Sequence, residues 1–255
     1  MRRLLRPFFD AAARAGFDIH RAATLRRLPR FVRDAAQYRR GADGQFPLTW
    51  ADLEPILTDF TAEAGVARGH YFHQDLWAAR RIYAQRPPHH VDVGSRIDGF
   101  VAHVLAFMPV TVVDIRALHS DVEGLTFVRG DMCRLDAFAS GSVASLSCLH
   151  AVEHVGLGRY GDPVDPGGWR RAMRELARIL APGGRLYLGT PIGRERVSFN
   201  SQRVFAPSTV LDTFSDLRLA AFSAVGDDER FVPDADPASV ARSHNACGLF
   251  EFTRA

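Results

Sequence analysis

The sequence contains no lysine, so all 32 of its basic residues are arginine. Cysteine is also scarce: Cys133, Cys148 and Cys247 are odd in number and lack the spacing of a metal site. We therefore exclude a disulfide framework and interpret them as reduced thiols that fill the core. No apolar run is long enough to cross a bilayer. The start of the chain, MRRLLRPFFDAAARAG, lacks the apolar centre of a signal peptide, so we expect a cytoplasmic protein.

The net charge is positive only in the first 40 residues. Residues 1–40 carry 11 arginines against three aspartates, a net charge of +8, and the remainder carries 21 arginines against 26 acids, a net charge of −5. The overall charge of +3 and the pI near 9.0 thus belong to an N-terminal arm. A globally basic surface for nucleic acid is disfavoured, and we expect no nucleic-acid partner.

Apolar residues of the arm recur at helical spacing and predict two helices. Their apolar faces consist of Leu4, Leu5, Phe8, Phe9 and Ala12 in the first and Leu25, Leu28, Val32 and Ala35 in the second. A basic amphipathic arm could contact an anionic membrane peripherally. It could instead pack on the main domain or on a second copy in a homodimer, which the pattern favours. Because GADGQFP then breaks the chain, we predict a helical arm at 1–44 and an α/β domain at 45–255.

Beyond residue 90, strand-length apolar runs alternate with helical segments. The runs are HVDVG, VTVVDI, LTFVRG, VASLSCL, RLYLGT, LRLAAFSAV and LFEFT, and the predicted helices cover 97–107, 169–180 and 207–215. This alternation predicts a doubly wound, seven-stranded α/β sheet that is mostly parallel. The last two runs have no crossover helix between them, so we expect them to pair antiparallel. Before the first strand, Thr49 and Asp52 predict a capped helix start and 74–85 a further helix.

In an open parallel sheet, ligands bind beyond the carboxyl ends of the strands. The first strand ends in Asp92, Gly94, Ser95 and Arg96, and the second in Asp114 and Ile115. The third ends in Asp131 and Met132, and the fourth in His150, Glu153 and His154. A carboxylate about 20 residues past a glycine turn can accept hydrogen bonds from a ribose diol. This spacing would also suit NAD, but the sequence lacks Gly-x-Gly-x-x-Gly.

Together with RELARILAPGGRLYLGTP, these strand ends resemble the class I S-adenosylmethionine (SAM) methyltransferases over residues 91–192. The resemblance implies a Rossmann-like fold with an antiparallel last strand, SAM as cofactor and methyl transfer as activity. It also implies cofactor contacts from Asp92, Gly94, Asp114, Asp131 and Met132, and we expect the neighbouring Ser95, Arg96 and Ile115 to contribute as well. The VDxGSRxDGF core is similar to a domain family of unknown function, which indicates a divergent subgroup.

One departure from the methyltransferase pattern concerns the first motif, where Arg96 and Asp98 occupy the second and third glycine positions. Glycine there lets the backbone approach a ligand. Arg96 could bind the carboxylate of the cofactor's methionine part as a fork, or it could pair with an acid such as Asp98 or Asp75. A third interpretation is that the pocket no longer binds SAM.

Methyl transfer to a hydroxyl requires aligned reactants and often removal of a proton. We predict His150, Glu153 and His154 as the catalytic group, with one histidine as general base. The alternative for His154 is a structural hydrogen bond. The segment GHYFHQDLW precedes the first strand, and we expect it to close over the cofactor through His73 or Asp75. Its histidine spacing is too common to indicate a metal, so none is expected.

Two polar loops, at 158–169 and 193–207, are candidates for the acceptor wall. Arg194, Asn200 and Arg203 could hold a sugar or an anionic acceptor, and the alternative is a solvated surface loop. The sequence therefore predicts a SAM-dependent methyltransferase acting on a small-molecule or glycan-like hydroxyl acceptor. A dehydrogenase is disfavoured. The alternative outside enzymes is an inactive SAM-fold partner or scaffold of a membrane-associated biosynthetic complex.

Overall fold

The computed structural model describes residues 23–42 and 44–255, so the expected helix with Leu4 and Phe8 lies outside the described residues. Contacts along the chain divide it into two units, Met1–Val66 and Ala67–Ala255. The domain boundary expected at residue 44 stays a prediction. In the described part, no helix combines the length and the apolarity that crossing a membrane requires.

The described part of the first unit is built around one helix. A 3₁₀ turn, η1 (Leu25–Arg27), leads into α3 (Leu28–Gly41), and Pro29 lies in the first turn, where its missing N–H costs nothing. Residues after Gly44 contact this helix: Arg27 donates to the Leu57 carbonyl at 2.8 Å, and the Arg30 guanidinium lies 4.3 Å from the Phe60 ring centre. The segment that follows the predicted break therefore packs on α3.

The predicted cap at Thr49 forms, but the helix is one turn long. The Asp52 carboxylate accepts hydrogen bonds from the backbone N–H of Thr49 at 2.9 Å and from its hydroxyl at 2.7 Å. Only the 3₁₀ turn η2 (Trp50–Asp52) follows, and a second one, η3 (Asp59–Thr61), comes later. Pro55 disfavours helical backbone at Glu54, which explains why the turn does not propagate.

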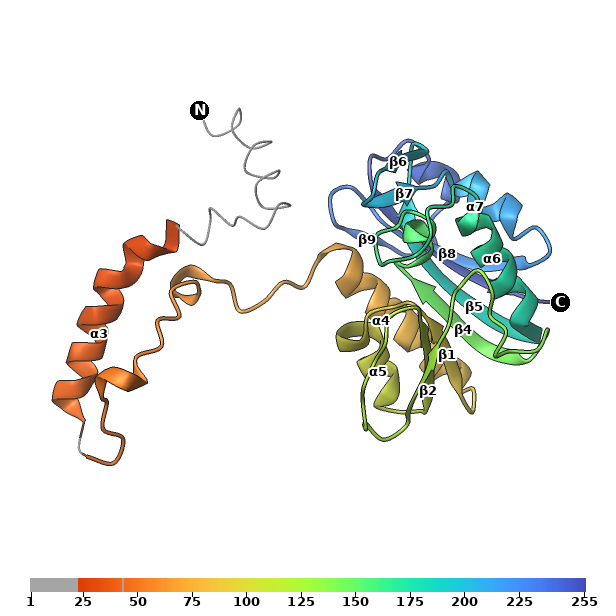
Figure 1. Ribbon diagram of the computed structural model, residues 1–255. Coiled ribbons are helices and arrows are strands. Elements are labelled where there is room, and N and C mark those ends of the chain that lie inside the picture. The colour runs from red at the N-terminus through yellow and green to blue at the C-terminus, as the bar shows by residue number, and fades with distance from the viewer. Residues whose placement is uncertain (1–22, 43) are drawn as a thin grey trace. The chain divides into compact units, whose positions relative to one another are not determined.

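The second unit contains an eight-stranded sheet in the order β3-β2-β1-β4-β5-β10-β8-β9 (Figure 1). Its strands are β1 (His90–Val93), β2 (Val110–Asp114), β3 (Leu125–Arg129), β4 (Val143–Leu149), β5 (Leu180–Ile192), β8 (Arg218–Val225), β9 (Phe231–Val232) and β10 (Ala246–Thr253). The first five are parallel, and β10 runs antiparallel to both β5 and β8. The predicted seven strands and the antiparallel last pair are confirmed. The two-residue β9 adds an eighth strand at the edge.

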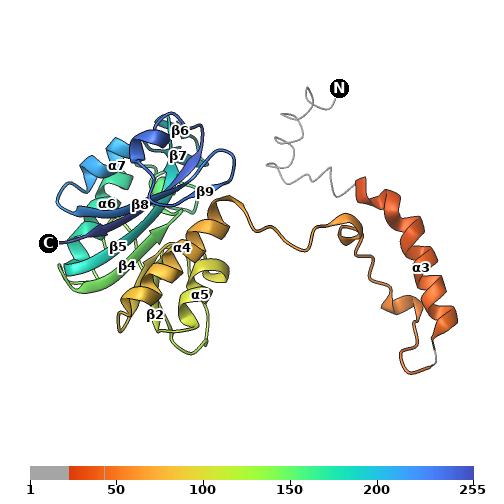
Figure 2. The ribbon, with the colours of Figure 1, turned by 180° about the vertical axis from the view of Figure 1, so that it is seen from behind.

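Helices cover both faces of the sheet (Figures 1 and 2). On one face lie α4 (Gly69–Gln85), the π-turn η4 (Ile97–Val101) and α5 (Ala102–Leu105), and on the other α6 (Gly168–Ile179) and α7 (Pro207–Thr213). Each face has its own buried apolar cluster, one around Trp77 and Phe100 and one around Met173 and Phe214. The helix predicted over 74–85 begins at Gly69 instead. A doubly wound sheet of this kind is the predicted fold class.

Three short elements complete the unit. The hairpin of β6 (Arg196–Ser198) and β7 (Gln202–Val204) follows β5 and forms a separate two-stranded sheet. The 3₁₀ turn η5 (Val152–His154) follows β4, and η6 (Pro237–Val240) precedes β10. The β7 strand contacts η5, so the hairpin supports the segment that carries two of the candidate catalytic residues.

Candidate active site

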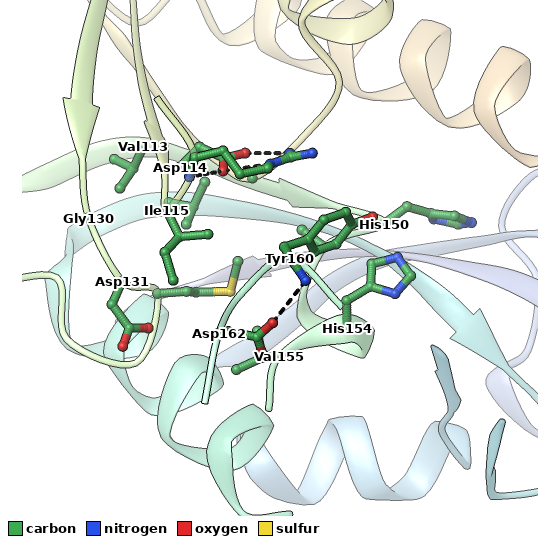
Figure 3. A pocket seen from close by; sticks show the side chains of 15 residues that line it. Val113, Asp114, Ile115, Gly130, Asp131, His150, His154, Val155, Tyr160 and Asp162 are labelled. Atoms are coloured by element: carbon green, nitrogen blue, oxygen red, sulfur yellow. Dashed lines mark hydrogen bonds and ion pairs between the residues drawn. The ribbon is translucent and has the colours of Figure 1, made fainter. Parts of the chain in front are cut away.

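A cleft lies beyond the carboxyl ends of β1 to β4. Strand β1 pairs with β2 on one side and β4 on the other, which makes this the topological switch point of the sheet. The cleft has two hollows that share six lining residues: Gly94, Asp114, Arg116, His150, His154 and Tyr160. In Figure 3, the two histidines lie on the opposite side of the pocket from Asp131. The topology thus brings together most of the residues predicted from strand ends.

The turn after β1 has room for glycine alone at position 94. Gly94 has a φ of +78°, and a Cβ there would lie 2.9 Å from the Cβ of Ala151. Below this turn, the fully buried Asp92 carboxylate accepts hydrogen bonds from the Ser95 N–H at 3.0 Å and from the hydroxyls of Ser95 and Ser147 at 2.5 Å. Burial raises the pKa of Asp92 to about 6. Asp92 therefore holds the turn in place through Ser95 and ties it to β4 through Ser147.

The arginine in the glycine motif fits the turn without strain. Arg96 has φ −74° and ψ 130°, an ordinary extended conformation that requires no glycine. Its guanidinium contacts the Asp98 carboxylate at 2.9 and 3.2 Å and lies 5.1 Å from the Tyr71 ring centre. Of the interpretations left open by the sequence, pairing with Asp98 is the arrangement in this structure. Arg96 and Tyr71 both line one of the two hollows, the one that Asp131 does not line.

Asp114 lies at the end of β2, as predicted, but it already has a partner. Arg116 binds its carboxylate in a fork, with Nη2 at 2.6 Å and Nε at 3.0 Å, and the Arg116 backbone N–H adds a third contact at 2.8 Å. The Arg116 guanidinium also lies 4.5 Å from the ring centre of Tyr160. Neither Arg116 nor Tyr160 was predicted from the sequence. The Asp-x-Arg spacing could have indicated the first.

The far side of the pocket is formed by the turn after β3. The Gly130 N–H donates to the Asp114 carbonyl at 3.1 Å, which joins this turn to the end of β2. The Asp131 carboxylate accepts the Cys133 N–H at 2.8 Å. Ile115, Met132 and Val155 supply apolar lining between the two strand ends. A flat, partly apolar ligand with a polar edge would find complementary groups here.

His154 lines the cleft and pairs with Glu153, which is buried behind it. The Nδ1 atom of His154 lies 2.7 Å from the Ser201 carbonyl, which places a proton on Nδ1, and burial lowers the pKa of His154 to about 4. Glu153 is fully buried, and burial raises its pKa to about 8. Its Oε1 atom lies 3.8 Å from Nε2 of His154. The imidazole is therefore neutral near pH 7, with its lone pair on Nε2.

His150 directly follows β4 and has an uncommon backbone conformation, with a φ of +48°. Its Nε2 atom lies 3.2 Å from Nδ1 of His70 in α4, and Tyr71 packs on its ring at 5.0 Å between centroids. Burial lowers the pKa of His150 to about 3. His150 lines the cleft as predicted, but its imidazole is engaged by a residue that the sequence analysis did not select for the site.

The loop after η5 closes one side of the cleft through Tyr160. The Asp162 carboxylate accepts the backbone N–H groups of Gly156 at 2.7 Å, Gly158 at 3.3 Å and Tyr160 at 3.1 Å. These contacts hold the Tyr160 ring beside His154, with centroids 5.6 Å apart. The loop predicted as an acceptor wall thus contributes an aromatic side chain to the cleft.

His73 and Asp75 do not line the cleft in this structure. His73 stacks on Phe231 at 5.7 Å between ring centroids. Asp75 is buried, accepts a hydrogen bond from Gln74 at 3.2 Å, and burial raises its pKa to about 6. Their predicted contact with a cofactor gains no support from these positions.

The predicted acceptor residues also lie away from the cleft lining. Arg203 is buried and donates to the backbone carbonyls of Val155 at 2.6 Å and Glu153 at 3.4 Å, so it stabilises the backbone on both sides of His154. Arg194 and Asn200 are exposed on the loop around β6. Direct contact between these residues and an acceptor stays a prediction.

Solved structures share this fold. YcgJ from Bacillus subtilis is 15% identical, with a TM-score of 0.51 over 72% of this chain and 99% of its own. A geranyl diphosphate methyltransferase in complex with SAM is 13% identical, with a TM-score of 0.52 over 72% of this chain and 85% of its own. The fold is that of the class I SAM-dependent methyltransferases. The predicted resemblance is confirmed at the level of the fold.

The class I methyltransferase fold does not by itself fix a reaction. The [4+2]-cyclase SpnF is 13% identical, with a TM-score of 0.50 over 75% of this chain and 85% of its own, and its name describes a different chemistry. Residues 134–226 match a family described as "Caenorhabditis protein of unknown function, DUF268", consistent with the predicted divergent subgroup. No curated protein sequence matches this chain.

Proposed function

We propose that this protein transfers a methyl group from SAM to a hydroxyl of a small-molecule or glycan-like acceptor. One observation carries the proposal: the cleft at the switch point has carboxylates at the ends of β2 and β3 beside a turn that only glycine fits. Nucleoside ligands need such an arrangement because their sugar and base present several hydroxyl and amino donors.

The residues present fit SAM. Asp114 would accept the ribose hydroxyls, Asp131 would accept an amino donor of the base, and Ile115, Met132 and Val155 would contact its apolar surface. When bound, SAM supplies an electrophilic methyl group on a sulfonium. The Asp114 carboxylate must exchange part of its contact with Arg116 for the ribose. Because Arg116 is about half exposed, its guanidinium can move without leaving water.

We assign the general base to His154. The Ser201 carbonyl fixes the proton on Nδ1, so Nε2 can accept a proton from the acceptor hydroxyl. The hydroxyl proton moves to Nε2 of His154 as the oxygen takes the methyl group, and the imidazolium then releases it to solvent. Glu153, which is protonated near pH 7, lies 3.8 Å from Nε2 and would stabilise the imidazolium through its carboxyl dipole. Tyr71 and Tyr160 would provide aromatic surface for the acceptor.

The test is transfer of labelled methyl from SAM to a panel of sugars, glycosides, phenols and amines. We expect at least one hydroxyl acceptor to be labelled, with turnover that His154→Gln lowers by about 10²–10⁴-fold. Labelling of amine acceptors alone would contradict the hydroxyl assignment, and no labelling by a protein that binds SAM would favour the second candidate below.

The second candidate is an inactive SAM-fold partner or scaffold of a membrane-associated biosynthetic complex. The occupied Asp114 carboxylate and the two replaced glycine positions favour it. This candidate predicts that SAM is either not bound or bound without turnover, and that the exposed apolar residues Leu25, Leu28 and Val32 of the arm make a partner contact.

A further inference from the structure

His70, His150 and Cys247 converge at the edge of the cleft from three separate parts of the chain. His70 lies in the first turn of α4, His150 directly follows β4, and Cys247 is buried in β10. One ligand-type atom of each residue lies within 4.8 Å of the corresponding atom of the other two. None of the three is close to another in sequence, so the cluster exists only because of the fold.

We infer that these three residues bind a divalent cation of the zinc type. Zinc prefers imidazole nitrogen and thiolate sulfur, in tetrahedral geometry. Two nitrogen ligands at about 2.0–2.1 Å from a tetrahedral zinc lie about 3.3 Å apart. Nδ1 of His70 and Nε2 of His150 lie 3.2 Å apart. The two imidazoles therefore already have the separation that a shared ion requires.

The backbone conformation of His150 restricts the direction of one of the two imidazoles. Its positive φ of +48° is uncommon for a residue other than glycine, and it directs the ring beyond the end of β4, where Nε2 meets Nδ1 of His70. The backbone N–H of His150 donates to the Gly189 carbonyl at 2.7 Å, which ties this position to β5.

Cys247 distinguishes this site from a simple pair of hydrogen-bonded histidines. Its Sγ atom lies within 4.8 Å of a ligand atom of each histidine, and in this structure it makes only a weak thiol contact, 3.9 Å to the other ring nitrogen of His150, Nδ1. On binding zinc, the thiol loses its proton to solvent and the thiolate becomes the third ligand. Three protein ligands leave a fourth position for water or for an oxygen atom from the cleft that His150 lines. The inference does not depend on the proposed methyl transfer.

The test uses the tag-free full-length protein, treated with a chelator and then titrated with Co²⁺ and Zn²⁺ alone. We expect one equivalent of either ion per chain, and a thiolate-to-cobalt charge-transfer band in the near ultraviolet. Cys247→Ser should remove this band, whereas the matched control Cys148→Ser should keep it. His70→Gln should weaken zinc binding by more than about 100-fold, beyond the loss of an outer-shell partner, and His103→Gln should not.

Any of three results would overturn the inference. The parent protein could fail to bind one equivalent of Co²⁺ or Zn²⁺, the charge-transfer band could persist in Cys247→Ser, or the zinc affinity could be unchanged in His70→Gln. Circular dichroism of each variant checks folding, and if Cys247→Ser does not fold, His70→Gln and the stoichiometry of the parent protein decide.

Discussion

Replacement of Asp114 by asparagine should weaken SAM binding without unfolding the protein. The substitution keeps the shape of the side chain but removes the charge that would accept the ribose hydroxyls. A charge-assisted hydrogen bond contributes about 1.5–3 kcal/mol. Because 1.4 kcal/mol is a factor of ten, the Kd for SAM should rise about 10- to 150-fold. Isothermal titration of parent and variant measures this difference directly.

The structural cost of Asp114→Asn should be small. Its partner Arg116 has a side chain that is 53% exposed, so solvent screens the ion pair, and such pairs contribute about 0–1 kcal/mol. The matched control is Asp136→Asn, which breaks the exposed pair of Asp136 with Arg134, also two residues apart. The control should bind SAM with the affinity of the parent.

Arg116 provides the opposite test of the same contact. If its pairing with Asp114 competes with the ribose, Arg116→Gln should leave SAM affinity unchanged or increase it up to about 5-fold, the equivalent of the pair's 0–1 kcal/mol. A large loss of affinity in Arg116→Gln would instead make the guanidinium a ligand contact. An unchanged affinity in Asp114→Asn would refute the proposed ribose site.

Four further predictions concern the base, the turn, the buried acid and the arm. His154→Gln should lower turnover by about 10²–10⁴-fold, the range for general base catalysis, with SAM affinity unchanged; an equal loss in both would place His154 in the cofactor site. Gly94→Ala should destabilise the fold by about 1–3 kcal/mol in denaturant titrations, because of its positive φ and the 2.9 Å contact, and an unchanged midpoint would contradict this. Burial raises the folded-state pKa of Glu153 from 4.5 to about 8, so its contribution to stability is present below pH 4.5 and is lost as the pH rises to about 8. In Glu153→Gln, stability should no longer fall over this pH range. Parallel curves of stability against pH for parent and variant would contradict this prediction. If the arm contacts membranes, the full-length protein should float with anionic vesicles, and a chain beginning at Ala67 should fold and bind SAM but not float. Equal flotation of the two proteins, or of neither, would exclude a membrane role for the arm.

Strand ends were predictable because sheet topology alone determines where they meet. In a parallel sheet the residues that follow the strands share one edge, so Gly94, Asp114 and His150 were expected there, and the structure places β1 between β2 and β4. No side-chain detail enters that argument. The antiparallel course of β10 followed in the same way, from the absence of a helix before it.

The predicted cofactor contact of His73 depended on where the helix before β1 begins. With a helix predicted from residue 74, His73 belonged to a loop that could close over a ligand. Because α4 begins at Gly69, the 3.6-residue period places His70 and Gln74 on one face and turns His73 toward Phe231. The fork between Asp114 and Arg116 was equally hidden, since a sequence does not show which of several partners a guanidinium selects.

Calorimetric titration of the full-length protein with SAM, its demethylated product and NAD tests the central claim most directly. We expect saturable binding of SAM and of the demethylated product at one molecule per chain, and no binding of NAD. A folded protein that gives no binding with either sulfur nucleoside would contradict the assignment of the cleft, and tight binding of NAD would replace it with a dehydrogenase.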